Sequence, residues 1–268
     1  MSSEFKGKVA VVTGGASGIG RATVELLVAK GCQVMVGDLH EASGQALAES
    51  LGPDHVAFQR CDVANFEDVK ALIQAAVSKF GGLDILVNNA GMGSDICTSV
   101  DLSPETWHRV IAVDLDSVFY GCKAAIPMMR LRGGGAVVNI ASISGLGGDY
   151  GFNAYNAAKG AVVNYTRSLA MDHAADHIRV NVVCPGLVAT RLTAFMDKKG
   201  ILPELTKTIP MKRIGRAEEI ARVVVFLASE DASYMTGSVV VADGGQTAST
   251  GNTDLGALMA GLHTDSPR

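Results

Sequence analysis

The chain has 268 residues, of which 48% are hydrophobic and 5% aromatic, and its formal net charge is −4 at pH 7. This length allows one large domain or two small ones, and because no second hydrophobic pattern or linker interrupts the chain we expect a single domain over residues 1–268. The negative charge and the lack of a Lys/Arg block argue against nucleic acid or an anionic membrane as a partner.

The apolar runs are too short to cross a membrane, and residues 1–12 show no signal-peptide pattern, so a cytoplasmic protein without a membrane partner is expected. The five cysteines are odd in number and form no C-x-x-C, which indicates neither a disulfide framework nor a zinc site. His173 and His177 have helical spacing but lack an H-E-x-x-H context and an obvious third ligand. We therefore expect no metal.

Seven short, nearly continuous apolar runs are typical of strands that are covered on both faces of a parallel sheet. They occupy residues 9–13, 33–38, 55–59, 84–88, 136–141, 179–183 and 238–242. Helical segments lie between them: residues 20–30 end at Gly31, and Ser103 and Pro104 mark the N-cap and first turn of another helix. This alternation predicts an α/β fold, a doubly wound Rossmann-type parallel sheet of about seven strands with helices on both faces.

Residues 13–20, TGGASGIG, follow the first strand and open the first helix. Gly14, Gly18 and Gly20 would permit a tight turn, close backbone approach to a pyrophosphate and close packing of the helix on the strand, while the helix N-terminus supplies amides. The spacing is G-x-x-x-G-x-G and not the usual G-x-G-x-x-G. Taken alone, the motif also fits a simple connection between a strand and a helix.

Asp38 stands at the end of the second predicted strand. A carboxylate at this position can accept hydrogen bonds from the adenosine ribose hydroxyls, and it would repel a 2′-phosphate. No Lys or Arg adjoins Asp38 or lies between Thr13 and Gly20. The sequence therefore predicts NAD as the cofactor in preference to NADP.

Residues 7–245 resemble the short-chain dehydrogenase/reductase family, because six of the family's motifs occur in this stretch in the family's order. They are TGGASGIG (13–20), CDV (61–63), NNAG (88–91), NIASISG (139–145), YNAAK (155–159) and CPGLVAT (184–190). By resemblance, Asp62 and Val63 would border the adenine, residues 89–91 would line the cofactor bed, and Val188 and Thr190 would hold the nicotinamide carboxamide. The cofactor-binding residues expected in all are Gly14, Ser17, Gly18, Ile19, Gly20, Asp38, Leu39, Asp62, Val63, Asn89, Ala90, Gly91, Tyr155, Lys159, Pro185, Val188 and Thr190.

Tyr155 and Lys159 are separated by one helical turn of small residues, so on a helix they would share a face. The pKa of a free phenol is about 10, and a nearby ammonium favours the tyrosinate, so Lys159 would tune Tyr155 toward proton exchange with an alcohol or carbonyl. Ser142 fits the family's serine that hydrogen-bonds the reacting oxygen. A Tyr/Lys pair alone is more often a solvated face, but together with Ser142 and the cofactor motifs it predicts a catalytic site.

Asp114 departs from the family's pattern, because many members have asparagine in a V-N-L tripeptide where this chain has Val113-Asp114-Leu115. In the family that residue anchors a water beside the lysine, largely through its backbone carbonyl. The backbone role would survive the replacement. A carboxylate close to Lys159 would also oppose the lysine's field at Tyr155, so Asp114 is included among the catalytic residues.

Residues 187–214 would form a mobile lid by analogy with the family. Its apolar residues favour a hydrophobic or ring-bearing secondary alcohol over a free sugar, although they could equally be core or subunit contacts. They are Leu192, Phe195, Met196, Ile201 and Leu202. Asp149 and Tyr150 lie between Ser142 and Tyr155 in the chain, where either could touch substrate.

The leading hypothesis is an NAD-dependent secondary-alcohol dehydrogenase or ketone reductase, with a homotetramer as the expected assembly. A 3-oxoacyl carrier-protein reductase would have the same fold and catalytic residues, but such enzymes usually prefer NADPH and dock an acidic carrier, whereas residues 171–176 of this chain, MDHAAD, are acidic. A dinucleotide-binding regulator without turnover is the third alternative. The presence of Ser142, Tyr155 and Lys159 argues against it, because binding alone would not require a serine at position 142.

The core motifs end near residue 245, and residues 246–268 form a C-terminal extension. Four of its apolar residues have the spacing of one side of a short helix. They are Leu255, Leu258, Met259 and Leu262. Either this segment is a frayed tail, or it docks on a neighbouring subunit near the active site.

Overall fold

The structure is a computed structural model, which describes every residue except 1–3, 249, 251–255, 257 and 260–268. Seven parallel strands form one sheet in the order β3-β2-β1-β4-β5-β6-β9. They are β1 (Val9–Thr13), β2 (Gln33–Asp38), β3 (Val56–Arg60), β4 (Ile85–Asn88), β5 (Gly135–Ile140), β6 (Ile178–Pro185) and β9 (Val239–Ala242). The seven predicted runs are these strands, which confirms the predicted doubly wound α/β sheet.

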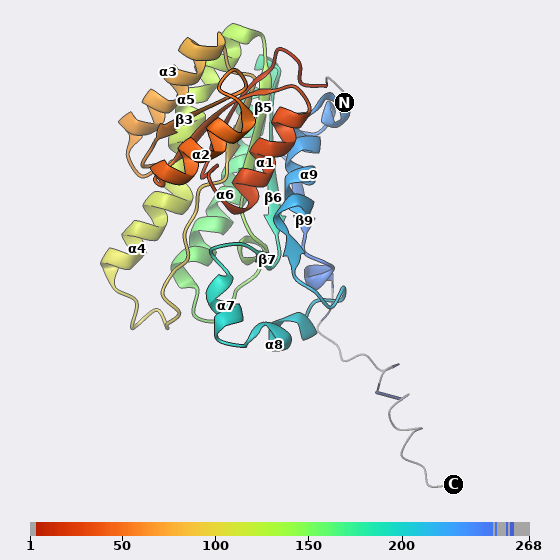
Figure 1. The fold of residues 1–268 in the computed structure, drawn as a ribbon. Helices are drawn as coiled ribbons and strands as arrows, with labels where there is room; N and C mark the ends of the chain where they lie inside the picture. The colour runs from red at the N-terminus through yellow and green to blue at the C-terminus, as the bar shows by residue number, and fades with distance from the viewer. Residues whose placement is uncertain (1–3, 249, 251–255, 257, 260–268) are drawn as a thin grey trace.

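Helices cover both faces of the sheet (Figure 1). One layer contains α1 (Gly18–Ala29), α2 (Glu41–Leu51) and α9 (Ala217–Ala228), and the other contains α3 (Phe66–Phe80), α5 (Ser117–Arg132) and α6 (Asn153–His173). Alternate residues of β1 divide between the two cores, with Val9 and Val11 packed in one and Ala10 and Val12 in the other. Continuous apolar strands are therefore required, because both faces of the sheet are buried.

The helix α4 (Pro104–Ile111) continues through a π-helical turn, η1 (Ala112–Asp116), into α5. Ser103 caps α4 as predicted, since its Oγ accepts the Thr106 N–H at 3.0 Å. Within the π-turn, the Ser117 hydroxyl donates to the Val113 carbonyl at 2.6 Å. This bond supports the wider turn, which points Asp114 into the protein interior.

A crevice opens at the carboxyl edge of the sheet, because β1 lies between β2 and β4 and the connections after β1 and β4 leave in opposite directions. Residues 187–214 lie beyond this edge, at the lower end of Figure 1, and include β7 (Val188–Ala189), α7 (Ala194–Lys198) and α8 (Leu202–Lys207). The strand β8 (Gly215–Arg216) follows and pairs in parallel with β7.

Short 3-10 turns complete the description: η2 (Ile143–Gly145), η3 (Ala174–Asp176), η4 (Glu230–Ala232) and η5 (Gln246–Ala248). Across the described part of the chain, no helix combines the length and apolar character that a membrane span requires. The sequence predicts that four apolar residues of the C-terminal extension lie on one side of a short helix. Two of them, Leu255 and Leu262, lie outside the described residues.

Candidate active site

The glycine-rich turn after β1 forms a backbone cradle at the crevice. Gly14 has φ +62°, and a Cβ there would lie 2.8 Å from the Ala90 Cα. At Gly20 a Cβ would lie 2.2 Å from the Gly14 carbonyl oxygen, so neither position can carry a side chain. Helix α1 begins at Gly18 on the wall of the crevice, which brings the positive end of its dipole to the opening. This cradle fits the diphosphate of a dinucleotide.

The loop after β4 is tied to the cradle by hydrogen bonds donated by residues 89 and 90 and accepted by residues 13 and 14. Thr13 Oγ1 accepts the backbone N–H groups of Asn89 and Ala90 at 3.0 and 3.1 Å. The Asn89 side-chain amide donates back to the Thr13 and Gly14 carbonyls at 3.0 and 3.1 Å. The NNAG motif therefore holds the two sides of the crevice at a fixed separation.

Asp38 ends β2 at the rim of the crevice, where it is 8% exposed. Its carboxylate accepts the Ala16 N–H at 3.0 Å and the His40 N–H at 2.9 Å. These bonds fix one carboxylate beside the glycine-rich turn and leave it further lone pairs for ribose hydroxyls.

Arg191 is a residue near this rim that the sequence did not point to. Its guanidinium Nη1 lies 3.1 Å from His40 Nε2, although the two residues are 151 positions apart. Arg191 and Asp38 line the same cleft, so a basic side chain that is distant in the sequence lies on the part of the wall to which Asp38 and His40 belong. A cation from the segment after β7 stands close to the end of β2.

A single cleft of about 860 Å³ brings the predicted cofactor-binding residues together. All of them line it except Gly20, which lies beneath the turn. The predicted catalytic residues Ser142, Tyr155, Lys159 and Asp114 line the same cleft. Asp149 also lines it, whereas the Tyr150 side chain is fully exposed to solvent.

Ser142 follows β5 and belongs to a short chain of hydroxyl groups. It accepts the Ser144 N–H at 3.1 Å, and its own hydroxyl lies 3.1 Å from Ser144 Oγ as a donor. Ser144 in turn donates to the Asp149 carboxylate. The sequence did not indicate Ser144, which is buried and orients the Ser142 hydroxyl.

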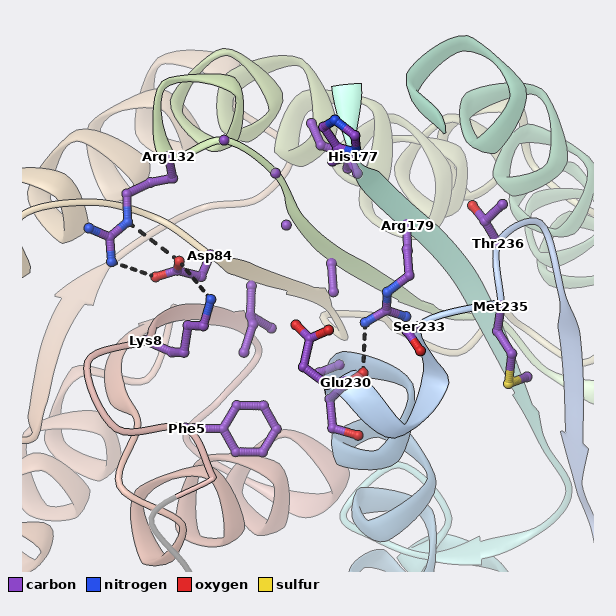
Figure 2. Close-up of a pocket in the computed structure, with 18 of the residues that line it drawn as sticks. Phe5, Lys8, Asp84, Arg132, His177, Arg179, Glu230, Ser233, Met235 and Thr236 are labelled. Carbon is purple, nitrogen blue, oxygen red and sulfur yellow. Dashed lines mark hydrogen bonds and ion pairs between the residues drawn. The ribbon is translucent and has the colours of Figure 1, made fainter. Parts of the chain in front are cut away.

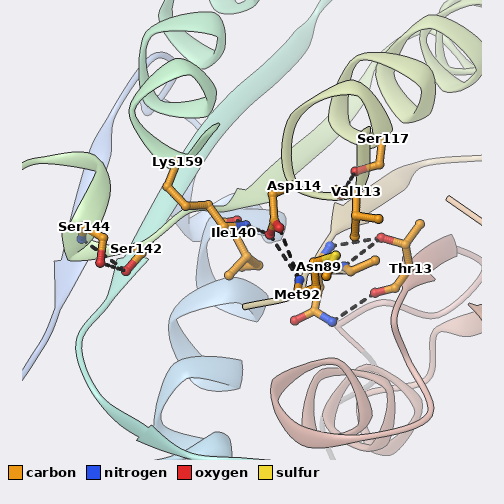
Figure 3. A network of polar contacts seen from close by, with 11 residues as sticks. Thr13, Asn89, Met92, Val113, Asp114, Ser117, Ile140, Ser142, Ser144 and Lys159 are labelled. Atoms are coloured by element: carbon orange, nitrogen blue, oxygen red, sulfur yellow. Dashed lines mark hydrogen bonds and ion pairs between the residues drawn. The ribbon is translucent and has the colours of Figure 1, made fainter. Parts of the chain in front are cut away.

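Tyr155 and Lys159 lie on one face of α6 as predicted, with the Lys159 ammonium 5.6 Å from the centre of the Tyr155 ring. The ammonium is buried and donates to the Ile140 carbonyl at 3.2 Å. Its second partner is the Asp114 carboxylate, at 3.0 Å (Figure 3). The Asp114 side chain is fully buried, and both of its oxygens lie 3.3 Å from the Met92 N–H.

Burial and charge together set the titration of this cluster. Burial raises the pKa of Tyr155 above that of a free phenol; Lys159 acts to lower it and Asp114 to raise it. Burial disfavours the Lys159 ammonium, but the charges of Asp114 and Tyr155 outweigh it and raise the pKa of Lys159. Burial raises the pKa of Asp114, and the adjacent ammonium opposes this shift. The Lys159 ammonium, 3.0 Å away, therefore favours the ionised form of Asp114, whereas burial favours the neutral form.

The outer half of the cleft, formed by Phe152 and residues 187–214, carries many apolar side chains. Phe152 precedes α6, and the others come from the segment beyond the carboxyl edge. They are Leu187, Leu192, Phe195, Met196, Leu205 and Ile209. Of the lid residues that the sequence singled out, Leu192, Phe195 and Met196 therefore line the cleft, and Ile201 and Leu202 are not among its lining residues.

A second hollow of about 760 Å³ lies at the opposite, amino edge of the sheet (Figure 2). Two of its basic side chains pair with one carboxylate: Asp84 contacts Arg132 at 3.1 Å and Lys8 at 3.6 Å. Arg179 donates to the carbonyls of Leu227 and Ser229 at 2.8 and 2.9 Å. This arrangement ties the first residues of neighbouring strands together and is remote from the motifs that form the cleft.

Comparisons with known proteins agree with this geometry. A family model described as enoyl-(acyl carrier protein) reductase matches residues 14–247. Cyclohexanol dehydrogenase of Acinetobacter sp. (strain SE19) is 41% identical over 250 residues, which cover 92% of this chain and 98% of that protein. The 3-oxoacyl-acyl-carrier-protein reductase of Chlamydia pneumoniae is 40% identical over 249 residues, covering 92% of this chain and all of that protein.

Among solved structures, levodione reductase superposes with a TM-score of 0.87 at 35% sequence identity, covering 91% of this chain and 99% of that one. Both the sequence and the structural likenesses therefore extend over most of the chain and are not confined to the glycine-rich turn.

Proposed function

Because the chain belongs to the short-chain dehydrogenase/reductase family, we propose that it transfers a hydride between NAD(H) and a secondary alcohol or ketone. The observation that carries this proposal is the meeting of Ser142, Tyr155 and Lys159 in the same cleft as the backbone cradle. A dinucleotide-binding regulator would need the cradle but would have no use for an acid/base cluster beside it.

The polar residues of the cleft have distinct tasks in the proposed reaction. A bound nicotinamide supplies or accepts the hydride at the carbinol carbon. Ser142 hydrogen-bonds the reacting oxygen, and Tyr155 gives a proton to that oxygen in reduction or takes it in oxidation. Lys159 stabilises the tyrosinate and, with residues 89–91, Val188 and Thr190, holds the cofactor.

The cofactor proposed is NAD, with Asp38 as the acceptor for the adenosine ribose hydroxyls. Two backbone amides fix the Asp38 carboxylate at the rim, which supports this assignment. Arg191 and His40 are the residues that would favour NADP, because a guanidinium can pair with a 2′-phosphate. The ratio of kcat/KM values for the two cofactors decides between them.

The substrate proposed is hydrophobic or ring-bearing. The apolar outer half of the cleft supports this class, because it would desolvate a hydrocarbon body while Ser142 and Tyr155 hold the oxygen. The names of two similar proteins, cyclohexanol dehydrogenase and levodione reductase, point in the same direction. Small sugars fit this apolar outer half poorly, because their many hydroxyl groups need hydrogen-bond partners.

The test is a panel of secondary alcohols with NAD and of ketones with NADH, followed by NADH fluorescence. Cyclic and long aliphatic members should be turned over with higher kcat/KM than short, polar ones. Tight NADH binding without turnover of any member would contradict the proposal and support a regulator.

A 3-oxoacyl thioester reductase is the second candidate, favoured by the 40% identity to the Chlamydia pneumoniae enzyme. It predicts turnover of 3-oxoacyl thioesters with NADPH, and a higher kcat/KM than with cyclic ketones and NADH. The same panel with both cofactors separates the two candidates.

We also propose that residues 1–268 form a single domain, with its core at 7–245, that assembles as a homotetramer in the cytoplasm. Four of the five cysteines are buried and all five are free, which suits a reducing compartment. Exposed apolar side chains on α5 and α6, including Phe119 and Met171, supply surface for the assembly.

A further inference from the structure

The carboxylate of Asp114 occupies a position that is built around it. Its Oδ1 lies 3.0 Å from Lys159 Nζ, and both oxygens face the Met92 N–H. A Cβ at Gly91 would lie 2.7 Å from Oδ1, so the NNAG loop can approach only because residue 91 has no side chain. Asp114 therefore joins the loop after β4 directly to the lysine (Figure 3).

This contact answers the question that the sequence left open at position 114. The carboxylate does not point away from the site but pairs with the ammonium. Two of the three N–H donors of Lys159 are then taken, one by Asp114 and one by the Ile140 carbonyl. The positive charge that would stabilise a tyrosinate at Tyr155 is offset by a negative charge at fixed distance.

Other charged or titratable groups face the cluster from two more elements. Asp149, in the loop before α6, adds a second negative charge near Tyr155. Cys184 lies on β6 beside Lys159, and burial raises the pKa of its thiol to about 11, so it stays neutral through most of the working range. Asp114 is the member of this group that touches the lysine.

We propose that Asp114 is a positioning residue that acts as the built-in counter-ion of Lys159 and keeps Tyr155 in its proton-donating form, suiting the site to ketone reduction near neutral pH. This inference rests on the proposed function. It concerns a departure of this chain from its family's pattern, since an asparagine at the same place would bring no charge.

The sign of the effect follows from the two directions of the reaction. Reduction needs the protonated phenol, so its rate falls at high pH; oxidation needs the tyrosinate, so its rate falls at low pH. The ionisation of Tyr155 therefore controls both the fall of the reduction rate at high pH and the fall of the oxidation rate at low pH. Removing the Asp114 charge stabilises the tyrosinate and should shift both limbs to lower pH by the same amount.

The experiment measures kcat/KM against pH in both directions for the wild type, Asp114→Asn and Asp116→Asn. Asp116 is on the same π-turn, but it is not among the described residues that line the cleft. Asp114→Asn should move both limbs down by about one pH unit or more. Asp116→Asn should leave them in place. Unmoved limbs, an equal shift in the control, or limbs that move apart would overturn the inference.

A second readout does not depend on turnover. The difference in tyrosinate absorbance between a protein and its Tyr155→Phe partner isolates one phenol among the five tyrosines. This difference should titrate at lower pH in the Asp114→Asn background than in the wild type, and an unchanged midpoint would refute the counter-ion role. If the asparagine variant fails to fold, Asp114→Ser provides a smaller neutral replacement for both measurements. A wild type that turns over no substrate would contradict the proposed function. The absorbance titration would still test whether the Asp114 charge shifts the titration of Tyr155.

Discussion

At Tyr155, a single oxygen atom carries the proposed proton transfer. Tyr155→Phe removes that oxygen and keeps the ring, so turnover should fall by roughly 10² to 10⁴ while cofactor affinity stays near the wild-type value. Steady-state kinetics and NADH titration measure the two quantities. Tyr234→Phe is the matched control, because the Tyr234 side chain is fully exposed at the opposite edge of the sheet. Retention of more than about half the activity in the Tyr155 variant would assign the proton to another group.

At the rim of the cleft, Asp38 should govern the choice of cofactor. Asp38→Ala removes both the ribose acceptor and the repulsion of a 2′-phosphate, so the preference for NAD over NADP should narrow. The ratio of the kcat/KM values for the two cofactors measures it. Arg191→Gln tests the opposing cation: selective loss of NADP activity would show that the guanidinium meets the phosphate. A wild type that prefers NADP would refute the assignment of Asp38.

At the residue scale, the sequence predicts the placement of side chains where that placement follows from chain spacing. Tyr155 and Lys159 share a helix, and their common face follows from four residues of separation. The contact between Arg191 and His40 joins residues 151 positions apart, and no local pattern indicates it. Similarly, the sequence showed that Asp114 was unusual, but only the packing of three segments showed which way its carboxylate points.

Among the elements, the amino ends of β1 and β4 are held by one carboxylate. Asp84 accepts the Val9 N–H at 2.9 Å and pairs with Arg132 and Lys8. Asp84→Ala leaves a buried N–H without its partner, so the free energy of unfolding should fall by about 1–3 kcal/mol. Urea denaturation measures the change, with Asp54→Ala on the exposed loop before β3 as control. Equal stability of the two variants would show that water replaces the carboxylate.

Element boundaries depend on partners that the sequence does not reveal. Residues 179–183 were predicted as a strand, and β6 runs from Ile178 to Pro185 because β5 and β9 flank it on both sides. Pro185 can close the strand where its missing N–H is not needed. The π-turn had no sequence signature, since Ala112 to Asp116 have ordinary helical character and the wider turn is supported by Ser117.

On the scale of the whole molecule, an aromatic face on α5 and α6 should mediate assembly. Phe119 is 44% exposed and stacks edge-on against Tyr165, at 6.4 Å between ring centres. Phe119→Arg should lower the mass observed by analytical ultracentrifugation to that of a dimer or monomer, because charge would be placed in an apolar contact. Lys70→Glu on α3, a change of charge at an exposed position, should leave the mass unaltered. An unchanged mass in the Phe119 variant would place the interface elsewhere.

The C-terminal extension belongs to the same scale, and its role stays a prediction from the sequence. If the extension docks beside a neighbouring active site, deletion of residues 249–268 should reduce the mass or melting temperature and raise KM. Unchanged mass, melting temperature and KM would show that this segment contributes nothing to assembly or substrate binding.

Because the π-turn joins α4 to α5, the number of residues in this turn fixes the rotation of α5 relative to α4. A chain one residue shorter there would turn α5 by about 100° relative to α4. Asp114 would leave its place beside Lys159, and Phe119 would leave the outer surface, although neither residue had been replaced. A substitution at this turn would test one proposed role at a time. A deletion should disrupt the proposed proton chemistry and the proposed subunit contact together, because both would depend on the same helical phase.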